Sequence, residues 1–472
     1  MTRVRTNPSS PLLSVLVLGV LALTACGDGI DERTHPLEPQ RDAVTTTAPE
    51  PIVLPTFEVE RSELVIDDTE ADYSGAHSAL RLADGTWLFS GYDDHSTFGE
   101  PEPGALWRGD LSEVARVGED LSDEKGQQVI ASLTELASGR VLAAGTNFSR
   151  DDPEADFYLY DASVWLSDDQ GTTFRQVSLQ QDAAVAGALV IDGSIFVHGY
   201  QFAAGAEGVA TGQIWYSDDD GESWRQLDPT YISTPGAAPT SLGTIDQLLI
   251  WEGSLIAIGR VSATDPDGSD YPLDRYSLSS STEQWEPIDL ALWYSDDLGA
   301  SWHDAPAQGL AGLADAQVPT AAAVVGYQLV IAGSASEASP EFDLDDSDPD
   351  DSDLDDSELG SPAMLPTIWT CDYPLQRCES VTVVEDGSEF VNAMVVEHKG
   401  LAFVAFSGFT DGDSDGEQLL AFDPLSGEFT LQALPAAFEQ TSAIVVDGDR
   451  LVLCGRDSGR DELAILLADI VG

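Results

Sequence analysis

A short hairpin motif, Ser-Asp-Asp-x-Gly-x-(Ser/Thr)-aromatic, occurs three times in this chain of 472 residues. Each copy follows a strand-like segment that contains Trp. The aspartate at the third position can accept hydrogen bonds from backbone N–H groups two and three residues further on. The glycine two residues later stands where a positive φ is expected. The key residues of the three copies are Ser167, Asp169 and Gly171; Ser217, Asp219 and Gly221; Ser295, Asp297 and Gly299.

An aromatic residue closes each copy and is expected to pack across the strand pair: Phe174, Trp224 and Trp302. The pattern resembles the Asp-box, or BNR repeat, of the sialidase-like β-propeller families, Ser-x-Asp-x-Gly-x-(Ser/Thr)-Trp. The resemblance implies that each box joins two strands of a propeller blade. We therefore interpret its residues as structural and not as catalytic groups.

A second repeat occurs seven times: an apolar strand, a glycine turn, and another apolar strand that ends at glycine. The turns lie about 50 to 75 residues apart, which is the spacing of propeller blades. The sequence therefore predicts an all-β, seven-bladed β-propeller with four-stranded blades over residues 52–472. The turn glycines are Gly85, Gly139, Gly193, Gly253, Gly326, Gly400 and Gly448.

In each blade we expect strand A to be innermost and the glycine turn to join A to B. Strand C carries the Trp, and the box joins C to D. The fifth blade has no box, but Cys371 takes the place of the box serine and Cys378 that of the box Trp. In an exported protein, this pair predicts a disulfide. The last blade lacks an outer strand, which the segment 57–65 is expected to supply.

The N-terminus, residues 1–25, has the pattern of a bacterial lipoprotein signal peptide. Arg3 and Arg5 precede an apolar stretch that is too short for an ordinary transmembrane helix. Leu23 to Cys26 resembles a lipobox, which implies cleavage before Cys26 and a lipid on its thiol. The alternative is a simple secretory signal. Residues 26–51 are interpreted as a flexible acidic tether.

The resemblance to lipoproteins implies a bacterial cell envelope location. Gly27 after the cysteine favours the outer membrane or cell surface. Membrane contact is expected only through the lipid anchor. Removing the signal peptide would leave 18 Lys and Arg against 84 Asp and Glu, a net charge of −66. Such a chain repels nucleic acid and anionic ligands. We expect a monomer, and Cys454 has no assigned role.

Propeller topology places the A–B and C–D turns on one face and the long loops on the other, where sialidases have their sites. Asp411, Asp413 and Asp415 match the opening of an EF-hand-like Ca²⁺ loop, without its twelfth-position Glu. The alternative is a solvated acidic loop. The insertion 260–290 carries residues that could stack on and bond to a glycan, or that pack locally: Tyr271, Arg275, Tyr276 and Trp285.

Three function classes follow. The first and favoured one is a non-catalytic module that binds a protein or glycan. The second is a sialidase-like glycoside hydrolase. The resemblance to sialidases implies a site in which three arginines bind a carboxylate and a Tyr/Glu pair supplies the nucleophile. The candidate arginines of the loop face are Arg150, Arg260, Arg456 and Arg460, and their spacing matches no family pattern. The third is an extracytoplasmic assembly or stability factor.

Overall fold

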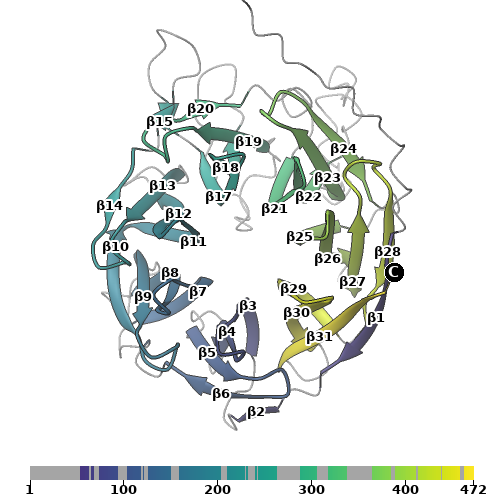
Figure 1. Ribbon diagram of the computed structural model, residues 1–472, viewed down its shortest axis with the longest axis horizontal. Coiled ribbons are helices and arrows are strands. Elements are labelled where there is room, and N and C mark those ends of the chain that lie inside the picture. Colours follow the sequence, from purple (N-terminus) through teal and green to yellow (C-terminus); the bar gives the residue numbers. More distant parts are fainter. Residues whose placement is uncertain are drawn as a thin grey trace, which may run out of the picture. The chain divides into compact units, whose positions relative to one another are not determined.

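The protein was analysed as a computed structural model, which describes residues 54–62, 65–67, 74–93, 104–118, 121, 126–149, 159–202, 210–228, 230–231, 240–241, 243–262, 288–305, 317–336, 364–383, 389–410, 413–436, 438–457 and 462–471. These residues form strands and turns, without a helix among them. The described segments accordingly hold no helix of the length and hydropathy needed to cross a membrane. Seven antiparallel sheets stand around a common axis (Figure 1). The predicted seven-bladed propeller is confirmed.

Each blade is an antiparallel meander in which successive strands lie farther from the ring axis (Figure 1). Blade 1 comprises β3 (Ser74–Arg81), β4 (Trp87–Asp93), β5 (Gly104–Gly109) and β6 (Glu113–Val117), with β2 (Val65–Asp67) added parallel to β6. Blade 2 comprises β7 (Gly126–Glu135), β8 (Val141–Ser149), β9 (Leu159–Ser167) and β10 (Arg175–Gln181). Blade 3 comprises β11 (Ala183–Ile191), β12 (Ser194–Phe202), β13 (Ala210–Ser217) and β14 (Arg225–Gln226).

The second half of the ring repeats this plan. A small sheet of β15 (Thr230–Tyr231) and β16 (Thr240–Ser241) precedes blade 4, which comprises β17 (Thr244–Trp251), β18 (Ser254–Ser262), β19 (Ile288–Ser295) and β20 (His303–Asp304). Blade 5 comprises β21 (Gln317–Val325), β22 (Gln328–Ser336), β23 (Met364–Asp372) and β24 (Cys378–Thr382). Blade 6 comprises β25 (Glu389–His398), β26 (Leu401–Thr410), β27 (Asp413–Phe422) and β28 (Phe429–Ala433).

The last blade closes the ring with a strand from the other end of the domain. It comprises β29 (Phe438–Asp447), β30 (Arg450–Asp457) and β31 (Glu462–Val471), and β1 (Thr56–Arg61) pairs antiparallel with β31. Phe57 of β1 is buried in the cluster shared by blades 6 and 7. The predicted closure by the N-terminal strand is confirmed, and it covers an edge that would otherwise be open.

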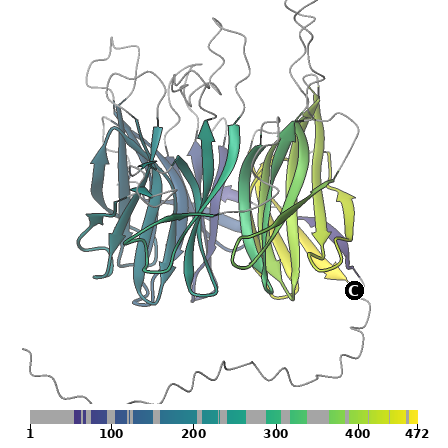
Figure 2. The ribbon, with the colours of Figure 1, turned by 90° about the horizontal axis from the view of Figure 1, so that it is seen from above.

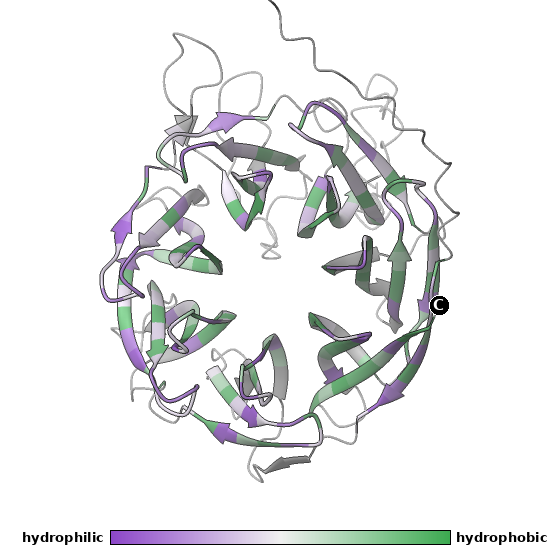
Figure 3. Ribbon diagram, viewed as in Figure 1, coloured by the Kyte–Doolittle hydropathy of each residue, from purple (hydrophilic) through white to green (hydrophobic). Residues whose placement is uncertain are grey.

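The hydrophobic core is divided among the blade boundaries. Seven clusters of buried side chains occur in the described residues, and each joins two neighbouring blades. Five strand-C tryptophans are nearly fully buried in them: Trp107, Trp165, Trp215, Trp293 and Trp369. The middle strands are apolar on both faces because each lies between two other blades. Figure 3 shows the outermost strands β14 and β20 as hydrophilic.

Strand A of each blade contains an irregularity opposite the end of strand B. In six of the blades one residue is extra, as between Ile245 and Gln247 of blade 4, and in blade 7 the shift spans Glu439 to Ala443. The partner at the bulge is a glycine for a steric reason. A Cβ on Gly259 would lie 1.7 Å from the carbonyl oxygen of Thr244. The strand-B glycines therefore allow the bulge. The prediction that strand B ends at this glycine was wrong, because each strand B continues beyond it, as β18 continues to Ser262.

The tight turns lie together at one end of the ring. In Figure 2 the turns between strands A and B and between C and D are at the lower edge. All seven A–B turn glycines have a positive φ, from 61° at Gly326 to 89° at Gly85. We call this end the turn face and the opposite end the loop face.

Candidate functional site

The three predicted hairpins share one set of hydrogen bonds on the turn face. The serine hydroxyl donates to the carboxylate at 2.8 to 2.9 Å and accepts the glycine N–H at 2.7 to 3.0 Å. The carboxylate accepts the N–H of the seventh motif residue at 2.8 Å in each copy. That N–H is four residues beyond the aspartate, an offset that was not expected. The expected offset of three occurs in the first copy, where the Thr172 N–H donates to Asp169 at 3.1 Å. Two successive residues with positive φ, such as Gln170 and Gly171, bring the later N–H back to the carboxylate.

The hairpins also fasten each blade to the one before it. A Cβ on Gly171 would lie 2.9 Å from Leu88 of blade 1, and one on Gly221 would lie 3.0 Å from Leu166 of blade 2. Burial alone would raise the pKa of Asp169. Hydrogen bonds from Thr173 and its neighbours outweigh burial and lower this pKa to about 2. A carboxylate held in this way supports the fold.

A basic residue links blades 2 and 3 on the same face. Arg140 donates from Nε to Asp168 at 2.7 Å and from Nη1 to Glu222 at 2.6 Å, and it also bonds to the Asp220 carbonyl oxygen. The hydrogen bonds that Arg140 donates to Asp168 and Glu222 raise the pKa of its guanidinium. The Arg140 guanidinium therefore joins the C–D hairpins of blades 2 and 3.

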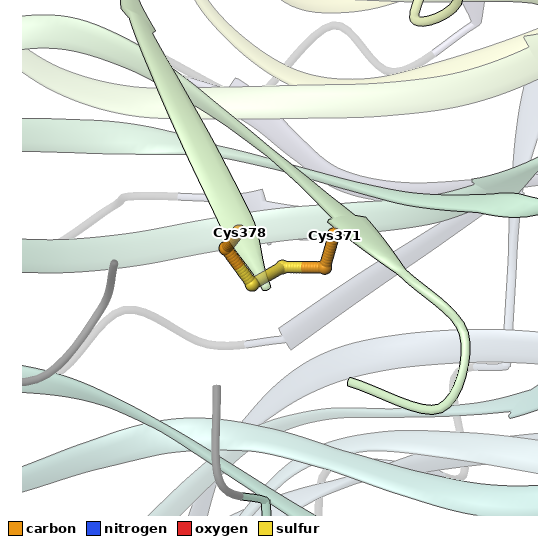
Figure 4. The surroundings of a disulfide bond; sticks show 2 residues. All are labelled: Cys371 and Cys378. Atoms are coloured by element: carbon orange, nitrogen blue, oxygen red, sulfur yellow. A yellow bond between two sulfur atoms is a disulfide. The ribbon is translucent and has the colours of Figure 1, made fainter. Parts of the chain in front are cut away.

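The fifth blade closes its hairpin covalently. Cys371 and Cys378 form a disulfide between β23 and β24 (Figure 4), and they face each other in the register. Cys371 pairs with Leu329 on β22, as Ser295 pairs with Leu255 on β18. The predicted bond and the predicted equivalence of Cys371 with the box serine are both confirmed. Cys454 is buried in β30, and burial raises its pKa to about 12, so it is an inert core residue.

Most of the predicted ligand residues lie outside the described residues. These are Cys26, Tyr271, Arg275, Tyr276, Trp285 and Asp411. Asp413 and Asp415 belong to β27, where Asp413 pairs with Thr410 in the hairpin from β26. Across the described ranges, no group of three or more His, Cys, Asp and Glu side chains is arranged to hold a metal. The calcium site therefore stays a prediction.

On the loop face, the described residues bring together a polar cluster that the motif analysis did not single out. Asp246 is the extra residue of the bulge in β17, and Arg260 follows Gly259 at the end of β18. The guanidinium donates to both carboxylate oxygens, with Nε–Oδ2 of 2.9 Å and Nη2–Oδ1 of 2.8 Å. A bidentate pair of this kind fixes both side chains in one orientation.

Two tyrosines complete this cluster from the preceding blades. Burial raises the pKa of Tyr200, near the end of β12; Arg260 opposes this shift, and Asp246 and Tyr160 add to it. Burial also raises the pKa of Asp246, against the lowering by Arg260. The cluster thus combines donors, acceptors and aromatic rings in a partly dehydrated place. We call Tyr160, Tyr200, Asp246 and Arg260 the rim cluster.

Unpaired polar groups lie on the strands beside the rim cluster. Thr244, the register partner of Arg260, is 6% exposed, and its hydroxyl has no hydrogen-bond partner within the described part of the chain. Gln317, the first residue of β21, is fully buried. Its amide oxygen and amide nitrogen likewise have no hydrogen-bond partner among the described residues. Buried polar groups normally have partners. Within the described residues, Thr244 and Gln317 therefore leave polar atoms without partners at the loop-face ends of blades 4 and 5.

Other polar residues near this face serve the ring itself. Glu417 accepts hydrogen bonds from Ser407 at 2.8 Å and from Thr441 of blade 7 at 2.6 Å. The His198 ring lies 3.3 Å from the carbonyl oxygen of Ile245 in the next blade, and burial lowers its pKa to about 4. A neutral His198 bridges blades 3 and 4. The glycine opposite the bulge is visible in the sequence, but the contact of Asp246 with Arg260 is not, which explains why this pair was missed.

No family model and no curated protein matches the chain. Similar solved structures include a protein of unknown function from Dyadobacter fermentans, at TM-score 0.46 and 11% identity over 87% of this chain and 99% of that one. An α-L-arabinanase from Penicillium chrysogenum in complex with arabinobiose has a TM-score of 0.43 and 13% sequence identity, over 72% of this chain and 92% of that one. Trypanosoma rangeli sialidase has a TM-score of 0.43 and 12% sequence identity, over 75% of this chain and 58% of that one.

Proposed function

We propose that this protein is a non-catalytic binding module of the bacterial cell envelope, anchored through a lipid on Cys26, that binds a glycan or protein on its loop face. The observation that carries the proposal is the bidentate Asp246–Arg260 pair beside Tyr200. Such a pair offers donors and acceptors to hydroxyl or amide groups, and a tyrosine ring offers a flat apolar surface.

The chemistry of the rim cluster favours binding over hydrolysis. A glycosidase of the usual kind needs two carboxyl groups about 5 to 9.5 Å apart on either side of the scissile bond. Asp246 is held by Arg260, and Glu417 is held by two hydroxyls between blades 6 and 7. A sialidase-like site needs three arginines. The described strand ends on the loop face carry Arg260 and Arg456, and Arg260 is committed to Asp246.

The net charge narrows the ligand class. At −64 for the whole chain, the surface potential opposes polyanionic ligands such as sialylated glycans. Neutral glycans and neutral or basic peptides bind without this penalty. The acidic residues Asp411, Asp413 and Asp415 supply a second candidate feature, a Ca²⁺ ion that would bridge an acidic loop to a ligand.

A glycan-array screen and a fluorogenic-glycoside screen of the full chain, with Ca²⁺ and with EDTA, test the proposal. We expect a bound glycan or peptide without turnover, and we expect Arg260→Gln to weaken binding at least about tenfold. Arg175→Gln, on the turn face and half-exposed, is the matched control and should leave affinity unchanged. The result that would contradict the proposal is hydrolysis of a glycoside by the wild type that Asp246→Asn abolishes. It would favour the glycoside hydrolase over the binding module, because the raised pKa of Asp246 suits an acid catalyst.

A further inference from the structure

Large apolar side chains are exposed on one sector of the turn face. Tyr327 is 80% exposed, Leu425 78%, Leu298 46% and Tyr373 45%. Tyr327 lies in the A–B turn of blade 5, and the others lie in the C–D turns of blades 6, 4 and 5. The described parts of blades 1 to 3 expose no large apolar side chain to this degree. We call these four residues the apolar turn patch.

Leu298 occupies a turn position that polar residues fill in blades 2 and 3. It has φ of 56°, a left-handed conformation that Gly, Asn and Asp adopt more easily. Its equivalents in blades 2 and 3 are Gln170 and Asp220, which accept hydrogen bonds from Arg108 and Ser138. A leucine there makes no such bond and remains exposed. Stability therefore does not explain why an apolar residue occupies this position.

The patch continues across the boundary between blades 4 and 5. The Tyr373 ring packs edge-on against Trp251, with centroids 5.3 Å apart and an interplanar angle of 79°. Trp251 is buried at the end of β17, so Tyr373 of blade 5 leans onto blade 4. Scattered exposed apolar residues are ordinary, but four of the six large apolar side chains that the described residues expose lie in turns of three consecutive blades on one face.

The border of the patch is acidic. Exposed carboxylates occur in the turns of the same blades: Glu252, Asp296, Asp372, Glu397 and Glu428. The exposed cations of these turns that the structure describes are already paired, Arg377 with Glu379 at 2.6 Å and Lys399 with Asp449. A second copy would bring the same acidic border and a net charge of −64, and an anionic bilayer would be repelled in the same way.

We propose that the apolar turn patch is a docking surface for another protein whose apolar pockets are bordered by Lys and Arg side chains. Leu298, Tyr327, Tyr373 and Leu425 would fill the pockets, and the acidic border would pair with the basic one. Tyrosine is among the residues that carry the most energy in such interfaces. This surface is separate from the rim cluster, because it lies on the turn face.

Site-specific photo-crosslinking identifies the partner. A photoreactive phenylalanine replaces Tyr327 in the full chain in the producing cells, and the matched control carries it at Gln170 on the same face. We expect one protein to cross-link from position 327 and not from 170. Cross-linking only to a second copy of the chain, or an identical pattern from both positions, would refute the proposal.

Binding of the purified partner to the full chain then tests the chemistry. The triple variant Leu298→Asn, Tyr327→Ser and Leu425→Ser should lose at least about tenfold in affinity. Leu431→Ser, exposed on the outer strand β28, is the control and should change affinity less than about twofold. Affinity should also fall as ionic strength rises from about 0.05 to about 0.5 M.

Two results would overturn the proposal at this stage. One is a partner that binds the triple variant as well as the wild type. The other is binding to vesicles of phosphatidylethanolamine and phosphatidylglycerol that the triple variant loses, since that would make the patch a lipid contact. Unchanged thermal unfolding of the triple variant shows that the variant is folded.

Discussion

Replacing the buried box serine of blade 4 gives a direct test of the hairpin's structural role. Ser295 is fully buried, donates to Asp297 at 2.8 Å and accepts the Gly299 N–H at 2.7 Å. Ser295→Ala removes both bonds and leaves the Gly299 N–H buried without an acceptor. One net hydrogen bond contributes about 1 kcal/mol, and an unsatisfied buried group costs about 1 to 3 kcal/mol. The free energy of unfolding should therefore fall by about 2 to 4 kcal/mol.

Ser301→Ala is the matched control in the same hairpin. Its hydroxyl donates to Asp297 at 2.6 Å in an exposed position, and its backbone N–H keeps its own bond to that carboxylate. The expected loss is about 0.5 to 1 kcal/mol. Urea unfolding followed by tryptophan fluorescence measures both variants. Equal losses for the buried and the exposed serine would refute the role given to Ser295.

Three further predictions concern the disulfide, acid stability and the buried thiol. Replacing Cys371 and Cys378 by Ser should lower the free energy of unfolding by about 2 kcal/mol, because the closed loop is short; urea midpoints of the variant and of the reduced wild type should coincide. Asp169 has its pKa lowered from 3.8 to about 2, so its contribution to stability is complete above pH 3.8 and is lost as pH falls through 2. Asp169→Asn should flatten this acid dependence in denaturation at stepped pH, and an unchanged slope would count against it. In a Cys26→Ser background, native Cys454 should not react with a thiol reagent until urea unfolds the chain; rapid labelling of the native protein would contradict its burial.

Most of the fold could be predicted because it depends on local sequence patterns. A glycine with positive φ in each A–B turn and a serine–aspartate pair in three C–D turns are short-range requirements, so their spacing was visible without a structure. The same alignment placed Cys371 and Cys378 opposite each other, and the disulfide confirmed it. The expected hydrogen bond at an offset of three occurs in the first copy, but the bond at an offset of four in all three copies was not predicted, because it depends on two successive left-handed residues.

The rim cluster could not be found in this way. Asp246 reaches Arg260 because a bulge adds one residue to β17, and a bulge depends on how two strands pair. Tyr200 joins them from another blade, 46 positions from Asp246 in the chain. Sequence reasoning had looked for a ligand site in the long insertions, where acids and aromatic residues are conspicuous by composition alone.

The amino-acid sequence alone determined the number of blades, the closing strand and the covalent hairpin, because each follows from a repeating local pattern. Tertiary structure alone decided which side chains meet across blade boundaries. It divided the core into clusters between neighbouring blades, brought Tyr200 of blade 3 to Asp246 and Arg260 of blade 4, and gathered Tyr327, Leu298, Tyr373 and Leu425 on one face. These contacts depend on the packing of segments that lie far apart in the chain, so local sequence patterns do not predict them.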